Sequence, residues 1–149
     1  MEIKDKVVVI TGAAQGLGKN FAMDLAKRKA RLALADINVE LLEEVRKACE
    51  QAGTETRAYE LNVAEEKAVE DFFNQVVQDF GTVDGLINNA GITRDGMIAR
   101  SKDGEIRKMS LANWQAVIDV NLTGSFLCGR EFFVKLLEQK KPGVCINIS

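Results

Sequence analysis

The chain has 149 residues, of which 46% are hydrophobic, 28% are charged and one is proline. This length and composition are typical of one globular domain and exclude collagen-like, low-complexity and disordered chains. The formal net charge of −2 argues against a nucleic-acid-binding surface, which needs a dense basic patch. Histidine is absent, so histidine metal ligation and a histidine general base are excluded, and we expect no metal site.

The three cysteines, Cys49, Cys128 and Cys145, are an odd number at wide spacings, which favours reduced core thiols over a disulfide framework or a zinc cluster. No uncharged apolar run approaches the ~18 residues that a membrane helix needs, and the charged residues 1–6 do not resemble a signal peptide. We therefore expect a cytoplasmic protein that binds neither a membrane nor nucleic acid.

The first half of the chain alternates strand and helix patterns. Residues 7–10 form a β-branched apolar run, typical of a strand that is buried on both faces, and residues 31–36 and 56–61 predict the next two strands. The first helix is predicted from apolar residues at four-residue spacing, and the second from an apolar pattern between Asn38 as N-cap and Gly53 as stop. The residues at four-residue spacing are Leu17, Phe21 and Leu25.

The second half begins with the clearest helix, an apolar stripe from Val69 to Phe80 that ends at Gly81. Residues 83–88 and 144–148 predict two more strands, separated by a long helix from Ser110 to the Pro-Gly pair at 142–143. One face of that helix is expected to lie mostly in the core: Phe132, Phe133, Leu136 and Leu137.

Five strands that alternate with four helices predict an α/β fold, a doubly wound parallel sheet of the Rossmann type. A buried fifth strand with no helix after it would leave one of its faces uncovered. We therefore expect residues 1–149 to be the N-terminal, nucleotide-binding part of a single domain, truncated after the fifth strand, with the C-terminal part missing from this sequence.

The turn at residues 11–18 joins the first strand to the first helix and is rich in glycine. Gly12 permits a tight exit from the strand, Gly16 lets a pyrophosphate approach the backbone, and Gly18 lets helix and strand pack closely. The helix N-terminus offers unpaired N–H groups to an anion. The turn therefore predicts a phosphate-binding site.

Asp36 ends the second strand, 18 residues after Gly18, where the acid that binds the adenosine ribose hydroxyls of NAD is expected. A carboxylate there repels a 2′-phosphate, because like charges ~4 Å apart cost about 4 kcal/mol at an effective dielectric near 20. The sequence thus favours NAD(H) over NADP(H). The alternative is that Asp36 is only the neighbour of a helix N-cap and binds no ligand.

Further motifs carry a family resemblance. Asn-Asn-Ala-Gly at 88–91 follows the fourth strand, Asn121 lies inside the long helix, and Asn-Ile-Ser at 147–149 ends the fifth strand. Together with the glycine turn, these motifs resemble the short-chain dehydrogenase/reductase family over the whole chain. Within it, Leu-Asn-Val at 61–63 and the string at 88–95 are most similar to 3-oxoacyl-[acyl-carrier-protein] reductases.

The resemblance implies cofactor-binding residues. The glycine turn would hold the pyrophosphate, Asp36 and Ile37 would flank the adenosine ribose, the segment 62–63 would contact adenine, and the segment 89–91 would run along the cofactor. The full set is Gly12, Ala14, Gln15, Gly16, Leu17, Gly18, Asp36, Ile37, Asn62, Val63, Asn89, Ala90 and Gly91.

Asn121 resembles the asparagine of the family's catalytic tetrad, which interrupts a helix and holds a water in a proton relay. Alternatively, it is a helix-interior asparagine that satisfies a neighbouring carbonyl. The serine, tyrosine and lysine of the tetrad are not found, because the only tyrosine is Tyr59 and Ser149 aligns just before the family's serine. We expect residues 1–149 alone to be inactive.

The resemblance implies an oxidoreductase that transfers a hydride between NAD(P) and a carbonyl or alcohol, with a 3-oxoacyl thioester of acyl carrier protein or CoA as the expected substrate. One alternative is a dehydrogenase of another hydroxyl, such as a steroid, sugar or 3-hydroxyacyl-CoA. Another is a non-enzymatic nucleotide-binding module, if the chain ends at Ser149. The apolar long helix predicts a homo-oligomer, either a dimer or a tetramer.

The segment 99–110 is longer than in many relatives, and Asp103-Gly104 within it predicts a tight hairpin turn. Residues 94–108 hold five cations and three acids. Contact with an acidic carrier protein is one interpretation of this segment, and a solvated loop is the favoured one.

Overall fold

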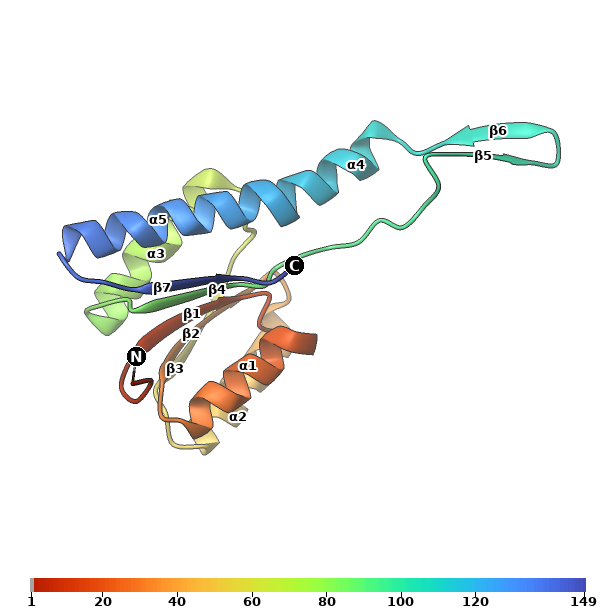
Figure 1. Ribbon diagram of the computed structural model, residues 1–149. Coiled ribbons are helices and arrows are strands. Elements are labelled where there is room, and N and C mark those ends of the chain that lie inside the picture. Colours follow the sequence, from red (N-terminus) through yellow and green to blue (C-terminus); the bar gives the residue numbers. More distant parts are fainter. Residues whose placement is uncertain (1) are drawn as a thin grey trace.

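A computed structural model describes residues 2–149 and shows a parallel sheet with helices on both faces (Figure 1). The five strands of this sheet are β1 (Val7–Thr11), β2 (Arg31–Asp36), β3 (Thr56–Glu60), β4 (Gly85–Asn88) and β7 (Val144–Asn147). Their order is β3-β2-β1-β4-β7, so the chain reverses direction across the sheet between β1 and β4. The predicted doubly wound parallel sheet is therefore confirmed, and a ligand of such a sheet binds at the carboxyl ends of the strands near this reversal.

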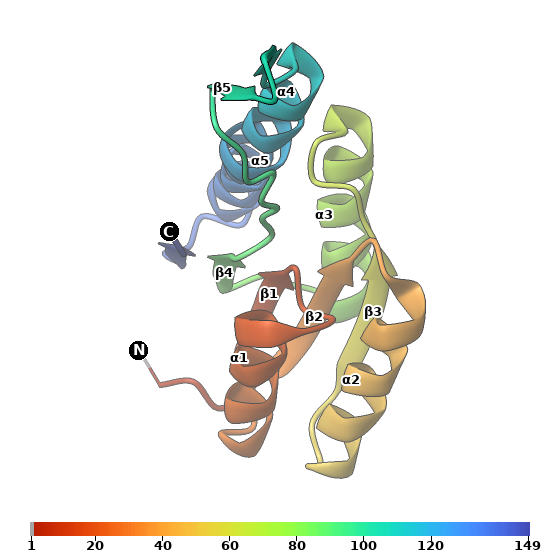
Figure 2. The same ribbon diagram turned by 90° about the vertical axis from the view of Figure 1, so that its right-hand side faces the viewer.

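The helices divide between the two faces of the sheet (Figure 2). One face carries α1 (Gly16–Lys27) and α2 (Val39–Gln51), and the other carries α3 (Glu66–Phe80) and α5 (Ser125–Glu138). Each face has its own apolar core, with Phe73 and Phe132 in one and Leu34 and Leu42 in the other. Because both faces are covered, β1 is buried at every residue and reads as one continuous apolar run.

Helix α1 is present as predicted, but its fully buried residues are small ones and not the large apolar residues that predicted the helix. Leu17 is 57% exposed, while Phe21 and Leu25 are only half-buried. The buried side consists of small residues: Gly18, Ala22 and Ala26. A Cβ atom on Gly18 would overlap the carbonyl oxygen of Gly12, so the helix lies too close to the turn for large side chains. Close backbone approach, rather than apolar size, determines the buried side.

The predicted long helix is present from Leu111 to Glu138, but one of its turns is π-helical. It consists of α4 (Leu111–Ile118), the π-helical turn η1 (Asp119–Gly124) and α5, and α4 extends beyond the sheet (Figure 1). Ser110 caps α4 by accepting a hydrogen bond from the Asn113 backbone N–H at 3.2 Å. A π turn inserts one residue into an α-helix and is frequent at functional sites.

Only two of the four α5 residues that are expected in the core are buried there. Phe132 and Leu136 are buried, whereas Phe133 is 51% exposed and Leu137 is 78% exposed. Consecutive residues of an α-helix are rotated by about 100°, so the two residues that follow the buried pair point away from the sheet. Uncovered apolar side chains also occur on β7, where Val144 and Ile146 are exposed.

The structure also contains a second, antiparallel sheet, whose two strands are not predicted from the sequence. It is a hairpin of β5 (Ala99–Lys102) and β6 (Glu105–Lys108), which projects into solvent beside the start of α4 (Figure 1). Asp103 and Gly104 have φ angles of 53° and 78°, so the connection is a type I′ turn. The predicted hairpin turn is confirmed.

Candidate functional site

A cavity of about 460 Å³ lies at the carboxyl ends of the parallel strands. This volume is within the ordinary range for small-molecule sites. Its lining comes from the segments that follow β1, β2, β3 and β4, and from η1. The lining residues are Gly12, Ala14, Gln15, Leu17, Asp36, Ile37, Asn38, Leu61, Asn62, Val63, Asn89, Ala90, Gly91, Ile92 and Val120.

The structure brings together nearly all of the predicted cofactor-binding residues. Gly16 and Gly18 are the exceptions: Gly16 begins α1 and Gly18 is buried in its first turn. Sequence reasoning missed four lining residues, each of which is adjacent in sequence to a predicted site residue. These four are Asn38, Leu61, Ile92 and Val120. Adjacency to a motif was therefore the signal that could have found them.

The glycine turn lies directly against the segment that follows β4. Gly12 has a φ of +65°, and a Cβ atom there would lie 2.8 Å from Ala90 Cα. A Cβ atom on Gly18 would lie 2.7 Å from Asn89 Nδ2. The turn therefore requires glycine at both positions, and an open backbone surface is left where a ligand can approach.

Asn89 and Thr11 fasten the turn to the end of β4. Asn89 Nδ2 donates to the carbonyl oxygens of Thr11 at 3.1 Å and Gly12 at 3.0 Å. In return, Thr11 Oγ1 accepts from the backbone N–H groups of Asn89 and Ala90, both at 3.1 Å. The sequence alone assigns no role to Thr11. These four hydrogen bonds make the two loops one unit before any ligand binds.

The Asp36 carboxylate accepts two backbone hydrogen bonds at the rim of the cavity. Its Oδ2 accepts from the Ala14 N–H and its Oδ1 accepts from the Asn38 N–H, both at 3.0 Å. Asn38 caps α2, because its own Oδ1 accepts from the Leu41 N–H at 3.1 Å. Asp36 is thus the neighbour of a helix N-cap and a lining residue at the same time. Each carboxylate oxygen has more than one lone pair, so it can still accept from a ligand hydroxyl.

Asn62 is held at the entry to α3. Its Oδ1 accepts from the Ala64 N–H at 3.1 Å, and its Nδ2 donates to Glu65 Oε1 at 2.9 Å. This local arrangement fixes the orientation of the amide beside Val63, which is buried against Gly124 of η1. The side chain therefore forms an ordered polar part of the cavity wall.

Asn121 does not line the cavity, but it positions a segment that does. Its Nδ2 donates to the Ile92 carbonyl oxygen at 3.0 Å, and its Oδ1 accepts from the Ile92 N–H at 2.8 Å. It lies within the π turn, so the helix interruption that the family resemblance implies is present. The carbonyl that it satisfies belongs to the loop after β4 and not to its own helix.

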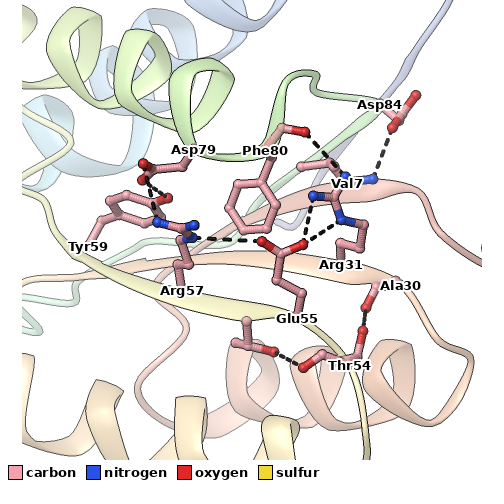
Figure 3. Close-up of polar contacts among 11 residues, drawn as sticks. Val7, Ala30, Arg31, Thr54, Glu55, Arg57, Tyr59, Asp79, Phe80 and Asp84 are labelled. Atoms are coloured by element: carbon pink, nitrogen blue, oxygen red, sulfur yellow. Dashed lines mark hydrogen bonds and ion pairs between the residues drawn. The ribbon is translucent and has the colours of Figure 1, made fainter.

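The chain's only tyrosine lies in a separate network at the outer edge of the sheet (Figure 3). Tyr59 Oη donates to Asp79 Oδ2 at 2.7 Å, and Arg57 pairs with the same carboxylate at 3.3 Å. Burial, together with the hydrogen bond to Asp79 and its charge, raises the pKa of Tyr59 above its ordinary value. Arg31 and Arg57 also lie over the Phe80 ring, at 5.2 Å and 5.6 Å from its centroid. Tyr59 therefore joins β3 to α3 and lines no part of the cavity.

Two further properties concern the part of the chain that the structure describes. Over residues 2–149, the Cys, Asp and Glu side chains form no group of three or more that could hold a metal ion. Across the same range, every helix is too short or too polar to span a lipid bilayer.

Comparison with known proteins assigns the family. Residues 6–149 match the short chain dehydrogenase family. The chain belongs to this family. Among curated short-chain dehydrogenases, it is 35% identical over 149 residues to "3-oxoacyl-[acyl-carrier-protein] reductase FabG" of Thermotoga maritima. It is also 34% identical over 150 residues to the protein of the same name from Staphylococcus epidermidis.

The chain spans little more than half the length of these relatives. The match covers 100% of this chain and 57% of the Thermotoga protein, and 97% and 56% in the Staphylococcus case. Among solved structures, a metagenomic short-chain oxidoreductase in complex with NADP aligns with a TM-score of 0.88 and 31% identity, over 100% of this chain and 64% of the other. NAD+-bound xylitol dehydrogenase aligns with a TM-score of 0.85 and 31% identity, over 99% and 54%.

Proposed function

We propose that this short-chain dehydrogenase transfers a hydride between a nicotinamide cofactor and a carbonyl or alcohol carbon. The observation that carries the proposal is the single cavity in which the glycine turn, Asp36 and residues 89–91 meet. Its position at the carboxyl ends of the strands is the one that dinucleotides occupy in doubly wound sheets. The cofactor would supply the hydride, and the chain's own residues would bind and orient it.

The residues present fit such a cofactor. The N-terminus of α1 offers unpaired N–H groups to a pyrophosphate, and glycine at 12 and 18 keeps the backbone accessible. Asp36 would accept hydrogen bonds from the adenosine ribose hydroxyls, and Asn62 with Val63 would border the adenine. Because Asn89 and Thr11 already fasten the turn, these groups need little rearrangement to bind.

We propose that NADH binds more tightly than NADPH, because the Asp36 carboxylate would repel the 2′-phosphate. Titrating both cofactors into the whole protein by fluorescence tests this preference. Asp36→Ser should reduce the difference in affinity between NADH and NADPH, since it removes the charge and keeps a hydroxyl. As a control, Asp24→Ser on the exposed side of α1 should leave that difference unchanged. Equal or better NADPH binding by the unmodified protein would reject the preference.

We propose a 3-oxoacyl thioester as the substrate, reduced to the 3-hydroxyacyl form, and a cytoplasmic location. The names of the curated relatives support this substrate. A dehydrogenase of another hydroxyl is the second candidate, and the likeness to xylitol dehydrogenase favours it. Assaying the whole protein with NADH and a 3-oxoacyl thioester, and with NAD+ and xylitol, distinguishes the two.

We propose that Asn121 acts in catalysis as a proton-relay residue, held in place by its two hydrogen bonds to Ile92. In the whole protein, Asn121→Ala should lower kcat about tenfold or more, while the Kd for NADH changes less, because a proton-relay role affects the chemical step rather than ground-state binding. Measuring kcat and Kd separately checks this.

Residues 1–149 alone should bind cofactor and reduce no ketone, because their only tyrosine, Tyr59, is hydrogen-bonded to Asp79 outside the cavity.

We also propose that the whole protein forms a dimer or a tetramer. The exposed apolar side chains of η1 and α5 support this proposal: Leu122, Phe126, Phe133 and Leu137. Contiguous apolar surface of this kind marks interaction sites. Sedimentation of the whole protein at micromolar concentration tests the proposal, and a monodisperse monomer would refute it.

A further inference from the structure

A second cavity, of about 310 Å³, lies where the β5–β6 hairpin meets the start of α4. Its charged lining residues are four cations and one acid: Arg94, Arg100, Arg107, Lys108 and Asp95. Residues 94–108 as a whole carry five cations and three acids, although the full chain has a net charge of −2. Cations therefore outnumber acids in this segment of an acidic protein.

The hairpin register places two of these cations side by side. Arg100 is directly opposite Arg107 in the antiparallel pair, so both side chains leave the same face of the hairpin. Like charges directly opposite each other are destabilising. Arg107 has one acidic neighbour, Glu105, at 3.3 Å. Over residues 2–149, Arg94, Arg100 and Lys108 form no ion pair, so the charge of the cavity is largely uncompensated.

The hairpin itself has little to stabilise it. All eight residues of β5 and β6 are exposed, and the apolar side chains of Ile98 and Ile106 are 84% and 74% exposed. An isolated two-stranded hairpin is marginally stable in water. An anion between the two arginines would remove their repulsion and join the strands by hydrogen bonds.

The charged cavity is close to the candidate cofactor site. Ile92 lines the cofactor cavity and Arg94 lines the hairpin cavity, two residues later in the chain. Two residues of extended chain span at most about 7 Å. The two cavities are therefore lined by adjacent parts of the same loop after β4.

We propose that the hairpin cavity binds a phosphate group carried by the substrate. The proposal rests on the proposed thioester reduction for its substrate class, the phosphopantetheine arm that CoA and acyl carrier protein share. The guanidinium forks of Arg100 and Arg107 hold phosphate oxygens in a bidentate manner, which lysine does less well. Met97 and Met109 provide flexible apolar lining for the rest of the arm.

Calorimetry of the whole protein, saturated with NADH, tests the site without turnover. The probes are inorganic pyrophosphate and CoA, and NADH prevents CoA from entering the cofactor cavity. The double substitution Arg100→Gln and Arg107→Gln should weaken both probes about tenfold or more, the change expected for lost charge-assisted hydrogen bonds. Lys102→Gln is the matched control, because Lys102 is a hairpin cation outside the cavity lining. Equal affinity in the double variant, or no binding by the unmodified protein, would overturn the proposal.

Steady-state kinetics identify which molecule carries the phosphate. The double variant should raise KM about tenfold for a 3-oxoacyl-CoA or for the same acyl group on acyl carrier protein, with kcat retained. The carrier whose KM rises is the molecule that supplies the bound phosphate group. KM for the phosphate-free N-acetylcysteamine thioester should not change, and an equal rise for all three would overturn the proposal. If no thioester is reduced, the proposed substrate fails, and the pyrophosphate titration still decides the anion site.

Discussion

The two sheets of this molecule are stabilised by different means. The parallel sheet is covered on both faces, and its central strand β1 is buried at every residue. The β5–β6 hairpin is exposed at every residue and depends on a type I′ turn at Asp103 and Gly104. Burial stabilises the first sheet, and turn chemistry stabilises the second. A substitution should therefore have a large effect on folding in the parallel sheet and a small one in the hairpin.

The largest effect is expected in the core beside the parallel sheet. Phe73 is fully buried on α3, and Phe73→Ala should lower the free energy of unfolding by about 3–5 kcal/mol, because it removes apolar contact and leaves a cavity. Urea denaturation of the whole protein measures this change. A loss below about 1 kcal/mol would mean that this side of the sheet is not the principal core.

Glycine substitutions give the next comparison. Gly18→Ala places a Cβ atom against the Gly12 carbonyl, so it should cost about 1–3 kcal/mol and weaken NADH binding. Gly104→Ala has open space around it but a φ of +78°, so it should cost the hairpin about 1–2 kcal/mol without changing global unfolding. Thermal unfolding and hydrogen exchange of the hairpin amides separate global from local effects. Equal losses of global stability in Gly18→Ala and Gly104→Ala would contradict the expected difference between the two sheets.

Paired charges at the amino ends of the parallel strands predict a smaller, pH-dependent effect. Asp84 accepts from the Val7 N–H at 2.9 Å (Figure 3) and pairs with Lys141 at 2.7 Å. Burial favours the neutral acid, but the hydrogen bonds from Lys141 and Val7, with the charges of Lys141 and Lys6, outweigh it and hold the pKa of Asp84 below its ordinary value.

A carboxyl group with a lowered pKa stabilises the folded state above the unfolded pKa near 4, and this contribution disappears as pH falls through the folded-state value. The free energy of unfolding should therefore fall as the pH drops below the unfolded pKa near 4. Asp84→Asn should be about 1.5 kcal/mol less stable at pH 7 and should show a shallower decline. A pH profile identical to that of the unmodified protein would show that other carboxylates cause the decline.

The smallest effect is expected on the hairpin surface. The apolar side chain of Ile106 is already exposed in the folded protein, so Ile106→Ser should change the free energy of unfolding by less than about 0.5 kcal/mol. Urea denaturation alongside Phe73→Ala provides the direct comparison. A loss above about 1 kcal/mol would show that the hairpin packs against another surface in the whole protein.

The sequence was a good guide where one local rule decides the structure. Buried runs such as residues 31–36 predict parallel strands, and Asp103-Gly104 predicts a turn. It was less informative for α1, because the apolar spacing of Leu17 and Phe21 predicted the helix but not which of its sides is fully buried. Close approach of the helix to Gly12 decides that side, and such an approach depends on the tertiary structure.

For the candidate site, the motifs predicted which residues would meet but not what holds them together. The hydrogen bonds of Thr11 to the segment after β4 join positions separated by 78 and 79 residues. The contact of Asn121 with Ile92 joins positions 29 residues apart. No local pattern reports such distant contacts, and the sequence shows Thr11 only as the first residue of the glycine turn.

The π turn at Asp119–Gly124 also determines where the chain can change length. A π turn holds one residue more than the α-helix that it replaces, so removing one residue there would restore regular α-helix and leave the residues after it facing as they do now. Phe132 would stay in the core, and Phe133 would stay exposed. Removing one residue from the regular part of α5 before Phe132 would instead rotate everything after it by about 100° and turn Phe132 out of the core. The π turn is therefore a position in this helix where the chain can lose a residue and keep its buried face.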